Sequence, residues 1–439
     1  MKVLILAAGR SKRMYPVTDK NFLNFLGKPL IQHQIEIVKS AGFKDIILVG
    51  GEHNLAALMA LAVELSKKLK LNIEVIEQEN LDLGMCGAVL AAKNSIKNSP
   101  VIVFSSNDVV EAEAFKQIEK MSSTLADSFI LGKMVHQYFP GGYLKMDKSA
   151  YISEIIEKPE PGTEPSKMVN VVVHLHKKPE VLVKYLEKTK SKKDDLYEVA
   201  LSKMMTDGIK MMAVEYDGFW QPVKYPWHIQ NVFRFLMSKA KKSISKSAEI
   251  AKSAVINGQV IIGERVKIFD NAVINGPCYI GDDSVIATNS LVRDSNIGRG
   301  CIIGFSTEVA RSFLSDEVWT HSNYIGDSVI GNNVSFGAGT VTGNLRLDER
   351  EVEISVDGKK LNAHTNKFGA MIGSHVRVGV NTSLMPGVRI GSGCFIGAGI
   401  LVPEDIPENS FVRGTFELKI SQNKTDVSAM RRDNLKKKL

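Results

Sequence analysis

Residues 250–292 read IAKSAVINGQVIIGERVKIFDNAVINGPCYIGDDSVIATNSLV, with an aliphatic residue at every sixth position from the first residue of this stretch to the last. Four residues after each of the first seven aliphatic positions comes a small or modest side chain, such as Ala254. The aliphatic pattern returns over residues 372–402. A period of six fits neither an amphipathic helix nor a coiled-coil heptad.

A six-residue unit can supply one short strand and one turn, but it cannot bury its aliphatic side chain alone. Stacked units can bury these side chains as a continuous ladder, so the sequence predicts a parallel β-solenoid. Between the two runs the register slips, and residues 344–367 form a polar insertion. Long loops in regular solenoids tend to be functional. We therefore expect chemistry near this interruption.

Two stretches near the interruption carry a family resemblance. Residues 320–327 read THSNYIGD, and residues 333–344 read NVSFGAGTVTGN. Together with the repeat, they resemble the left-handed β-helix acyltransferases, and within these the acetyltransferase half of bifunctional N-acetylglucosamine-1-phosphate uridylyltransferases, especially their archaeal-type relatives. The resemblance implies a left-handed parallel β-helix of hexapeptide repeats that packs as a homotrimer.

The same resemblance implies roles for individual residues of the solenoid. His321 matches the general base that takes a proton from the 2-amino group of glucosamine-1-phosphate as it attacks acetyl-CoA, which suits a side chain that titrates near neutrality. Ala338 would offer its backbone N–H to the tetrahedral oxyanion. Further substrate contacts are implied for Arg311, Tyr324, Asn344 and Lys367. Leu345 stands where these relatives have tyrosine, so another amino sugar remains open as acceptor.

The N-terminal half alternates strand and helix patterns. Strands are predicted at residues 2–6, 45–49 and 73–76, with helices at residues 30–41 and 54–68. This rhythm is typical of an α/β domain with a mostly parallel sheet, whose ligand lies at the carboxyl ends of the strands. A glycine turn at residues 9–14 follows the first strand. Such a turn exposes backbone N–H groups to phosphate, and its cations can neutralise a triphosphate.

With Lys20 and residues 27–31, this turn resembles the signature of sugar-1-phosphate nucleotidyltransferases, usually written G-x-G-T-R-x(n)-P-K, and the resemblance covers the whole half. It implies a Rossmann-like domain in which Arg13 and Lys20 act on the triphosphate and Asp108 holds Mg²⁺. It also implies substrate contacts for Gly9, Gln78, Gly84, Gly142, Glu157, Lys158 and Asn170. Gln78 and Gly84 match the segment that meets the base. Lys158 matches the residue that meets the sugar phosphate.

The chemistry explains these residue types. Attack of a sugar-1-phosphate oxygen on the α-phosphorus of a nucleoside triphosphate needs alignment and charge stabilisation, without a protein nucleophile. Ser11, Lys12 and Asp19 depart from the signature, and Pro222 stands where Asp or Asn is usual. Because proline offers no side-chain ligand, Mg²⁺ would have Asp108, phosphate oxygens and water. An altered or lost transferase activity therefore remains open.

The bulk composition fits an enzyme without a membrane span. A chain of 439 residues predicts two or more domains. No stretch is apolar over the roughly 18 residues that a membrane helix needs, and the N-terminus lacks signal-peptide features, so we expect the cytoplasm. The four cysteines lie far apart, which favours buried thiols over a zinc site or disulfides. Half of the net charge of +8 lies in the last 25 residues, and no nucleic-acid partner is indicated.

We expect a nucleotidyltransferase domain over residues 1–232, a linker helix over 233–247, a β-helix domain over 248–414 and a basic tail over 415–439. The leading hypothesis is synthesis of a UDP-N-acetyl-sugar from acetyl-CoA, glucosamine-1-phosphate and UTP. One alternative is a nucleotidyltransferase for another sugar-1-phosphate, with UTP or dTTP and a structural solenoid. Another is an acetyltransferase with a degenerate first domain. A third is a regulatory or assembly subunit that binds sugar nucleotide without turnover.

Overall fold

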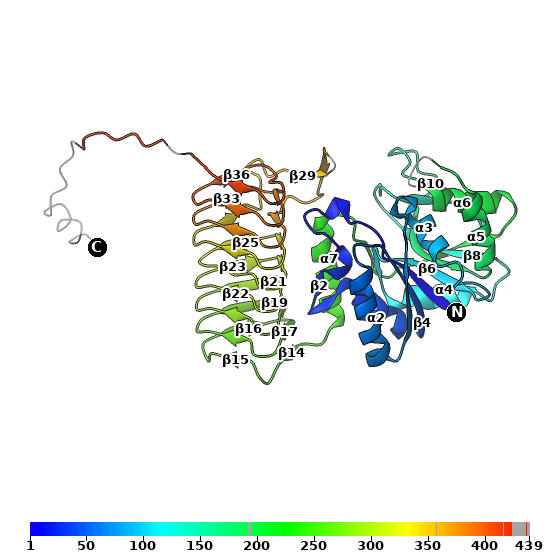
Figure 1. Cartoon of the computed structure of the whole chain (residues 1–439), viewed down its shortest axis with the longest axis horizontal. Helices are drawn as coiled ribbons and strands as arrows, with labels where there is room; N and C mark the ends of the chain where they lie inside the picture. The colour runs from blue at the N-terminus through cyan, green and yellow to red at the C-terminus, as the bar shows by residue number, and fades with distance from the viewer. Residues whose placement is uncertain (192–194, 357, 416, 424–435, 437–439) are drawn as a thin grey trace.

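The computed structural model describes residues 1–191, 195–356, 358–415, 417–423 and 436 of the chain. Figure 1 shows an α/β half, coloured from blue to green, that stands beside a column of stacked strands coloured from yellow-green to red. Within the described residues, no helix is both long and apolar enough to cross a membrane. Most of the expected basic tail lies outside the described residues.

A twisted sheet forms the centre of the α/β half. Its strands lie in the order β10-β9-β11-β6-β1-β4-β5, with β8 beside β11 and β12 beside β8. The bounds are β1 Lys2–Leu6, β4 Asp45–Gly50, β5 Asn72–Glu77, β6 Val101–Ser105, β8 Ser128–Met134, β9 Gly142–Met146, β10 Ile152–Glu157, β11 Met168–His176 and β12 Met211–Glu215. β6, β1, β4 and β5 are parallel, as the sequence predicts.

Helices cover both faces of this sheet. They are α1 (Leu30–Ser40), α2 (Leu55–Leu69), α3 (Gly84–Ala91), α4 (Ala112–Met121), α5 (Pro179–Lys188) and α6 (Leu196–Thr206). Because side chains alternate along a strand, β1 sends Val3 and Ile5 to a core with α1, α2 and α4, and Leu4 to a core with α3, α5 and α6. The two cores confirm the Rossmann-like α/β prediction.

Three ladders of short parallel strands form the C-terminal half. The first ladder holds β14 (Ser243–Ile244), β17 (Val260–Ile262), β19 (Val273–Ile280), β21 (Leu291–Ile297), β24 (Phe313–Leu314), β26 (Val329–Ile330), β31 (Met371–Ile372) and β34 (Arg389–Ile390). The second shares β19 and β21 and adds β16 (Val255–Asn257), β23 (Glu308–Ala310), β25 (Tyr324–Gly326), β28 (Val341–Thr342), β33 (Ser383–Leu384) and β36 (Leu401–Val402).

The third ladder begins with β15 (Glu249–Ile250), β18 (Lys267–Ile268), β20 (Val285–Ile286) and β22 (Ile302–Ile303). Trp319 bridges it to β27 (Ser335–Phe336), β32 (Arg377–Val378), β35 (Phe395–Ile396) and β37 (Phe411–Val412). Six-residue aliphatic positions such as Ile268 and Ile286 are buried inside the column, which confirms the solenoid prediction. Ile250 is only partly buried, because it lies on the first coil.

The solenoid is interrupted where the sequence predicts it. Neighbouring coils contact residues 18 positions apart, as Asn296 does with Leu314, whereas the backbone N–H of Ala370 reaches Ser328 across 42 positions. The extra residues form a hairpin of β29 (Glu353–Val356) and β30 (Lys359–Asn362), which Figure 1 shows beside the column. A bridge between Leu345 and Lys367 closes its base.

One expected element is placed differently. A linker helix was expected over 233–247, but helix α7 spans Ile229–Lys239 and follows the 3₁₀ turn η4 (Pro226–His228). The helix ends early because β14 already pairs with β17 as the first strand of the solenoid. It begins early because its apolar side, including Ile229, packs into the interface between the two halves.

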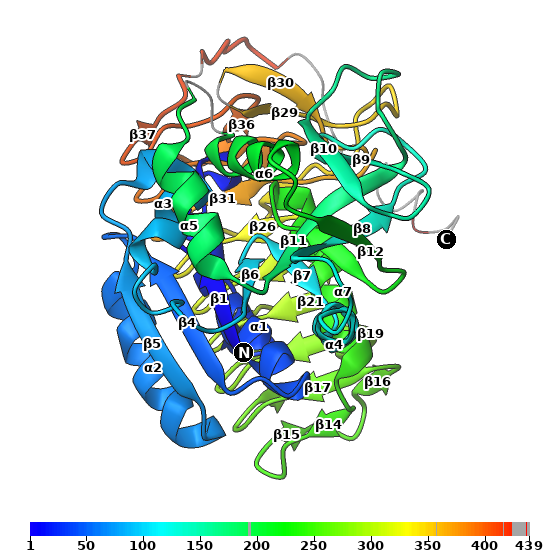
Figure 2. The ribbon, with the colours of Figure 1, turned by 90° about the vertical axis from the view of Figure 1, so that its right-hand side faces the viewer.

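That interface is apolar and continuous. Phe25 packs on Phe313 with ring centroids 4.9 Å apart, in a cluster that also holds residues of α7 and of the first ladder. At its edge, Arg234 of α7 forms an ion pair with Asp294. Figure 2 looks at the α/β half with the strands of the solenoid behind it. The first ladder is therefore covered, and the interface cluster of the described residues includes no residue of the third ladder.

We predict that Leu314→Ala destabilises the solenoid by about 2–5 kcal/mol, because Leu314 is fully buried in its core and the truncation leaves a cavity. Leu347→Ala is the matched control, since Leu347 is fully exposed. Denaturant unfolding of both variants measures the effect. Equal midpoints for the two variants would contradict the placement of Leu314 in the core.

Candidate active sites

The first candidate site begins at the turn after β1. A Cβ built on Gly9 would meet nothing within 4 Å, so a ligand can approach the backbone there. Ser11 has a φ of 51° and starts the 3₁₀ turn η1 (Lys12–Met14). The Ser11 hydroxyl accepts a hydrogen bond of 3.2 Å from the backbone N–H of Lys20. The turn and Lys20 are therefore held together.

Lys20 is the buried cation of this site, with only 5% of the residue exposed. It begins the 3₁₀ turn η2 (Lys20–Phe22), and its Nζ donates to the carbonyl of Val223 at 3.2 Å. Burial, with a smaller effect from the positive charge of Arg13, lowers the pKa of Lys20 to about 8. Such a group is short of a counter-charge, which a phosphate would supply.

Asp108 is a carboxylate whose charge acts on Lys20. It begins β7 (Asp108–Val110), which pairs antiparallel with β13 (Trp220–Pro222). Its carboxylate Oδ1 accepts a hydrogen bond of 2.8 Å from the indole N–H of Trp220. Burial raises the pKa of Asp108, against the lowering effects of Trp220, Lys224 and Lys20.

The donor set around Asp108 limits what metal it can hold. Pro222 stands opposite Asp108 in the strand pair, so the position offers no second carboxylate. No cluster of three or more metal-binding side chains occurs among the residues that the structure describes. Mg²⁺ commonly uses one or two carboxylates and takes its other ligands from phosphates and water. The residues present therefore fit an ion that arrives with the triphosphate.

The predicted base contacts come together at the end of β5. Gln78 is buried, and its Nε2 donates to the carbonyl oxygens of Asn80 at 2.9 Å and Gly84 at 3.0 Å. Gly84 has a φ of 52°, a conformation that favours glycine, and it begins α3. The amide of Gln78 thus fixes the loop before α3, which is the edge of the site.

The predicted sugar contacts also lie together. Gly142 pairs with Glu157 across β9 and β10. A Cβ on Gly142 would lie 3.0 Å from Glu157 Oε2 and 3.5 Å from Asn170 Cβ, so these residues share one small space. Asn170 is hydrogen bonded to the buried His174 at 2.7 Å. Lys158 lies beside them, with its Nζ 3.5 Å from Glu157 Oε1.

Segment 220–228 contacts both Asp108 and Lys20. It also holds Lys224, which the sequence analysis did not name as a site residue. Lys224 Nζ lies 3.4 Å from the carbonyl of Pro140 and 4.8 Å from the centroid of the Phe139 ring. Burial lowers the pKa of Lys224, and the neighbouring Asp108 opposes this change. The available signal was the position of Lys224, two residues after Pro222, where the family's second metal ligand is usual.

The same segment reaches the hairpin of the solenoid. The guanidinium carbon of Arg13 lies 5.7 Å from the ring centroid of Tyr225. Tyr225 stacks on Trp227 with centroids 4.5 Å apart. Both rings pack on a cluster from the hairpin region, composed of Val352, Ile354, Val356, Ala363 and Phe368. Arg13 therefore contacts an aromatic pair, Tyr225 and Trp227, that packs against the hairpin of the solenoid.

The second candidate site lies on the shortened coil that carries His321. His321 is exposed at a corner of the column, between Trp319 and β25. The side chain of Asn323 donates to the carbonyls of Gly337 at 2.8 Å and Thr340 at 3.0 Å, which ties this coil to the next. Ala338 therefore lies one coil above His321. The Ala338 N–H meets no hydrogen-bond acceptor in the described chain.

The other predicted contacts of the solenoid gather around Asp327, which follows β25. Arg311 makes two hydrogen bonds to Asp327, at 2.6 and 2.7 Å. Asn344 donates to the Tyr324 hydroxyl at 3.0 Å and also to Asp327. Lys367 is exposed nearby. Asp327 thus neutralises Arg311, a pairing that the sequence reasoning missed although the two residues are one coil apart.

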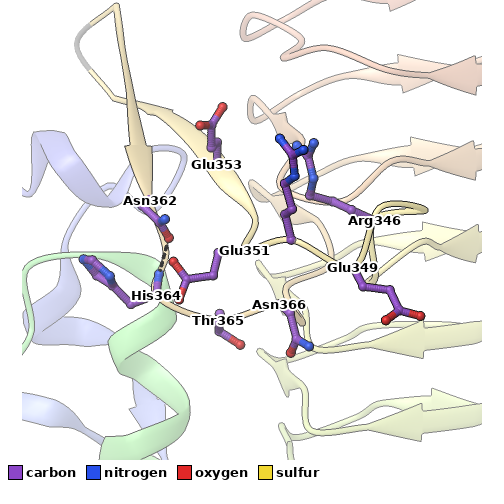
Figure 3. A pocket seen from close by; sticks show the side chains of 9 residues that line it. Arg346, Glu349, Glu351, Glu353, Asn362, His364, Thr365 and Asn366 are labelled. Atoms are coloured by element: carbon purple, nitrogen blue, oxygen red, sulfur yellow. Dashed lines mark hydrogen bonds between the residues drawn. The ribbon is translucent and has the colours of Figure 1, made fainter.

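Two pockets border this region. One of about 560 Å³ lies between the halves, and its lining includes Trp227, His228, Arg234, Arg311, Asp327 and Lys367. Figure 3 shows the other, of about 930 Å³, at the base of the hairpin. Its side chains come from the insertion and mix both charges: Arg346, Glu349, Arg350, Glu351, Glu353, Asn362, His364, Thr365 and Asn366.

Comparisons with known proteins match most of the chain. The family model described as nucleotidyl transferase matches residues 2–225. The model of the GMPPB C-terminal domain matches residues 239–360, and the bacterial transferase hexapeptide model, with six repeats, matches residues 369–399. The first model covers the α/β half, and the other two cover the solenoid.

Curated relatives are similar over nearly the full length. A bifunctional sugar-1-phosphate nucleotidylyltransferase/acetyltransferase of Sulfurisphaera tokodaii is 34% identical over 94% of this chain and 100% of its own. A bifunctional protein GlmU of Methanococcus maripaludis is 34% identical over 97% of this chain and 100% of its own. The bifunctional protein GlmU of Methanocaldococcus jannaschii is 31% identical over 95% of this chain and 98% of its own. The chain is an enzyme of the bifunctional sugar-1-phosphate nucleotidyltransferase/acetyltransferase family.

Proposed function

We propose that this enzyme makes UDP-N-acetylglucosamine in two steps. The solenoid transfers acetyl from acetyl-CoA to glucosamine-1-phosphate, and the α/β half transfers uridylyl from UTP to N-acetylglucosamine-1-phosphate. The observation that carries the proposal is that one chain, similar throughout to bifunctional relatives, gathers both predicted groups of side chains. Two observations support it: Gly142, Glu157 and Asn170 share one small space, and Asn323 ties the coil of His321 to the coil of Ala338.

In the uridylyl step, a phosphate oxygen of the sugar attacks the α-phosphorus of UTP, and pyrophosphate leaves. Arg13 and Lys20 stabilise the triphosphate as negative charge moves to the leaving group. Glu157 and Asn170 bind the sugar, and Lys158 its phosphate. Gln78 and the loop at Gly84 meet the base. Asp108 would hold Mg²⁺, which when bound adds positive charge at the phosphates.

In the acetyl step, the 2-amino group of the sugar attacks the thioester carbon of acetyl-CoA. His321 accepts the proton of the amine, and the C–S bond breaks to release CoA as a thiolate, which then takes up a proton to become the thiol. The free N–H of Ala338 stabilises the oxyanion. Asn344 and Lys367 contact the substrate, and Tyr324 holds the sugar phosphate together with Arg311, which is bonded to Asp327.

We propose that the solenoid assembles as a homotrimer. The third ladder carries exposed apolar side chains, which mark protein interfaces. Trp319, Phe395 and Phe411 on the third ladder are each at least half exposed. A second copy beside His321 would close the open acetyl-CoA site. We also place the enzyme in the cytoplasm, where its four buried thiols would stay reduced.

An assay of both half-reactions tests the proposal on the whole enzyme. Pyrophosphate is followed with N-acetylglucosamine-1-phosphate, UTP and Mg²⁺, and also with other sugar phosphates and nucleotides. Free thiol is followed with acetyl-CoA and glucosamine-1-phosphate. We expect both products with the named substrates. If no pair yields pyrophosphate, the uridylyl step is excluded and only the acetyl step remains.

We predict that kcat/KM for uridylyl transfer falls as the pH rises through about 8. Lys20 carries its charge below its pKa of about 8 and loses it above, and kcat/KM reports the free enzyme. Lys20→Arg keeps its charge at all these pH values, so its profile should lack the fall. A wild-type profile that stays flat to pH 10 would contradict the assignment of Lys20.

A further inference from the structure

The nucleotide site gathers more positive than negative charge at the phosphates. The positive charges of Arg13, Lys20 and Lys224 act on one another, and the carboxylates that act on Lys20 or Lys224 are those of Asp19, Asp108 and Glu157. Glu157 has its own partner, Lys158, at 3.5 Å. A partly buried cluster with this excess is costly unless an anion enters it. Its charge therefore fits a polyanionic ligand.

Lys224 stands at the centre of this excess. The charges that act on it are Asp108, Arg13, Glu157 and Lys158, so it lies between the phosphate contacts and the sugar contacts. No carboxylate lies within 4.0 Å of its Nζ in the part of the chain that the structure describes. The Pro140 carbonyl and the Phe139 ring hold its ammonium in place. The group is oriented, and it is left without an anionic partner.

The place of Lys224 follows from the strand pair that carries Asp108. Pro222 faces Asp108 there and gives a metal ion nothing to bind. Two residues further, the chain presents an ammonium. An acidic pair at this position would need a divalent cation before it could accept a phosphate, whereas a lysine attracts the phosphate directly.

We propose that Lys224 is a further substrate-binding residue, which contacts the α-phosphate of the nucleotide and makes triphosphate binding largely independent of Mg²⁺. The inference rests on the proposed uridylyl transfer, because it concerns the same site. It does not require that Mg²⁺ be absent from turnover. It states that a fixed ammonium supplies the charge that holds the nucleotide in place.

Binding measured by calorimetry on the whole enzyme tests this role. The probes are UTP and inorganic triphosphate, which carries similar charge without a base, each in EDTA and in excess Mg²⁺. We expect wild type to bind at least one probe in EDTA within about threefold of its affinity in Mg²⁺. Lys224→Met should weaken binding in EDTA by about tenfold to a hundredfold, the effect of one charged hydrogen bond, and Lys224→Arg should restore most of it.

Lys133→Met is the matched control. Lys133 also caps carbonyl groups and lies 5.6 Å from an aromatic ring centroid, that of Tyr216, but outside the site. Its loss should leave binding unchanged. The double variant Pro222→Asp with Lys224→Gly should bind only in Mg²⁺. Thermal melting shows whether each variant is folded.

The inference is overturned if wild type binds neither probe in EDTA, or if Lys224→Met binds as wild type does. Either result leaves uridylyl transfer in Mg²⁺ intact. Conversely, if no pyrophosphate forms with any substrate pair, the uridylyl proposal fails, while binding in EDTA that depends on Lys224 would still support a site that holds the nucleotide without turnover.

Discussion

Acetyl transfer by the His321→Ala variant is expected to fall by about 10²–10⁴-fold in kcat, the usual contribution of a general base. The imidazole is exposed and has no side-chain hydrogen bond within the described residues. Its removal therefore should not disturb the coil, which the Asn323 side chain holds. Thiol release from acetyl-CoA measures the effect, and pyrophosphate release by the same preparation should stay at the wild-type rate.

His375→Ala is the matched control for this experiment. His375 is another exposed histidine at a corner of the solenoid, and its imidazole is hydrogen bonded to Asn333 at 3.2 Å. It takes no part in the proposed site, so its loss should leave acetylation unchanged. Undiminished acetylation by His321→Ala, with a folded protein, would exclude His321 as the base.

The solenoid could be predicted closely because its signal is local and repeated. Each aliphatic position, such as Ile268 or Ile286, gives the same indication of a buried residue. The prediction therefore holds even where a single position departs from the pattern. The insertion was visible for the same reason, as a break in that register. Its fold as a hairpin packed on Tyr225 and Trp227 depends on contacts distant in sequence, and no local pattern reports these.

The interface between the halves also depends on contacts between residues distant in sequence, which no local pattern predicts. Phe313 and Val329 each precede an inward residue of the solenoid, Leu314 and Ile330, so they lie on its outer side. They are buried because α7 and Phe25 cover them. The helix was expected too far along the chain because the sequence does not show which residues the partner surface needs.

The candidate sites divide in a similar way. Gly142, Glu157 and Asn170 could be named from motifs, and the structure places them together. The residues that form hydrogen bonds or charge interactions with Asp108 could not be predicted from the motifs. The bond of Asp108 to Trp220 and the approach of Lys224 arise from a pair of short strands more than 100 residues apart in sequence.

Replacing Lys20 by methionine is expected to lower kcat/KM for uridylyl transfer by about 10²–10³-fold, the cost of removing one oriented group that stabilises transition-state charge. Lys20 is buried and its ammonium donates a hydrogen bond to the carbonyl of Val223, so its charge is held in one place in the site. Methionine has a similar length, and it removes a charge whose burial already lowers the pKa to about 8. The protein should therefore fold at least as well as wild type.

Lys93→Met is the control for Lys20→Met, because Lys93 forms an exposed ion pair with Glu187 far from the site. Both variants should acetylate glucosamine-1-phosphate at the wild-type rate, which shows that the solenoid is intact. The expected pattern is thus the reverse of that for His321→Ala, with one half-reaction lost and the other kept. If Lys20→Met keeps its rate of pyrophosphate release, the buried ammonium serves the fold rather than the triphosphate, and Arg13 with Lys224 must supply the charge.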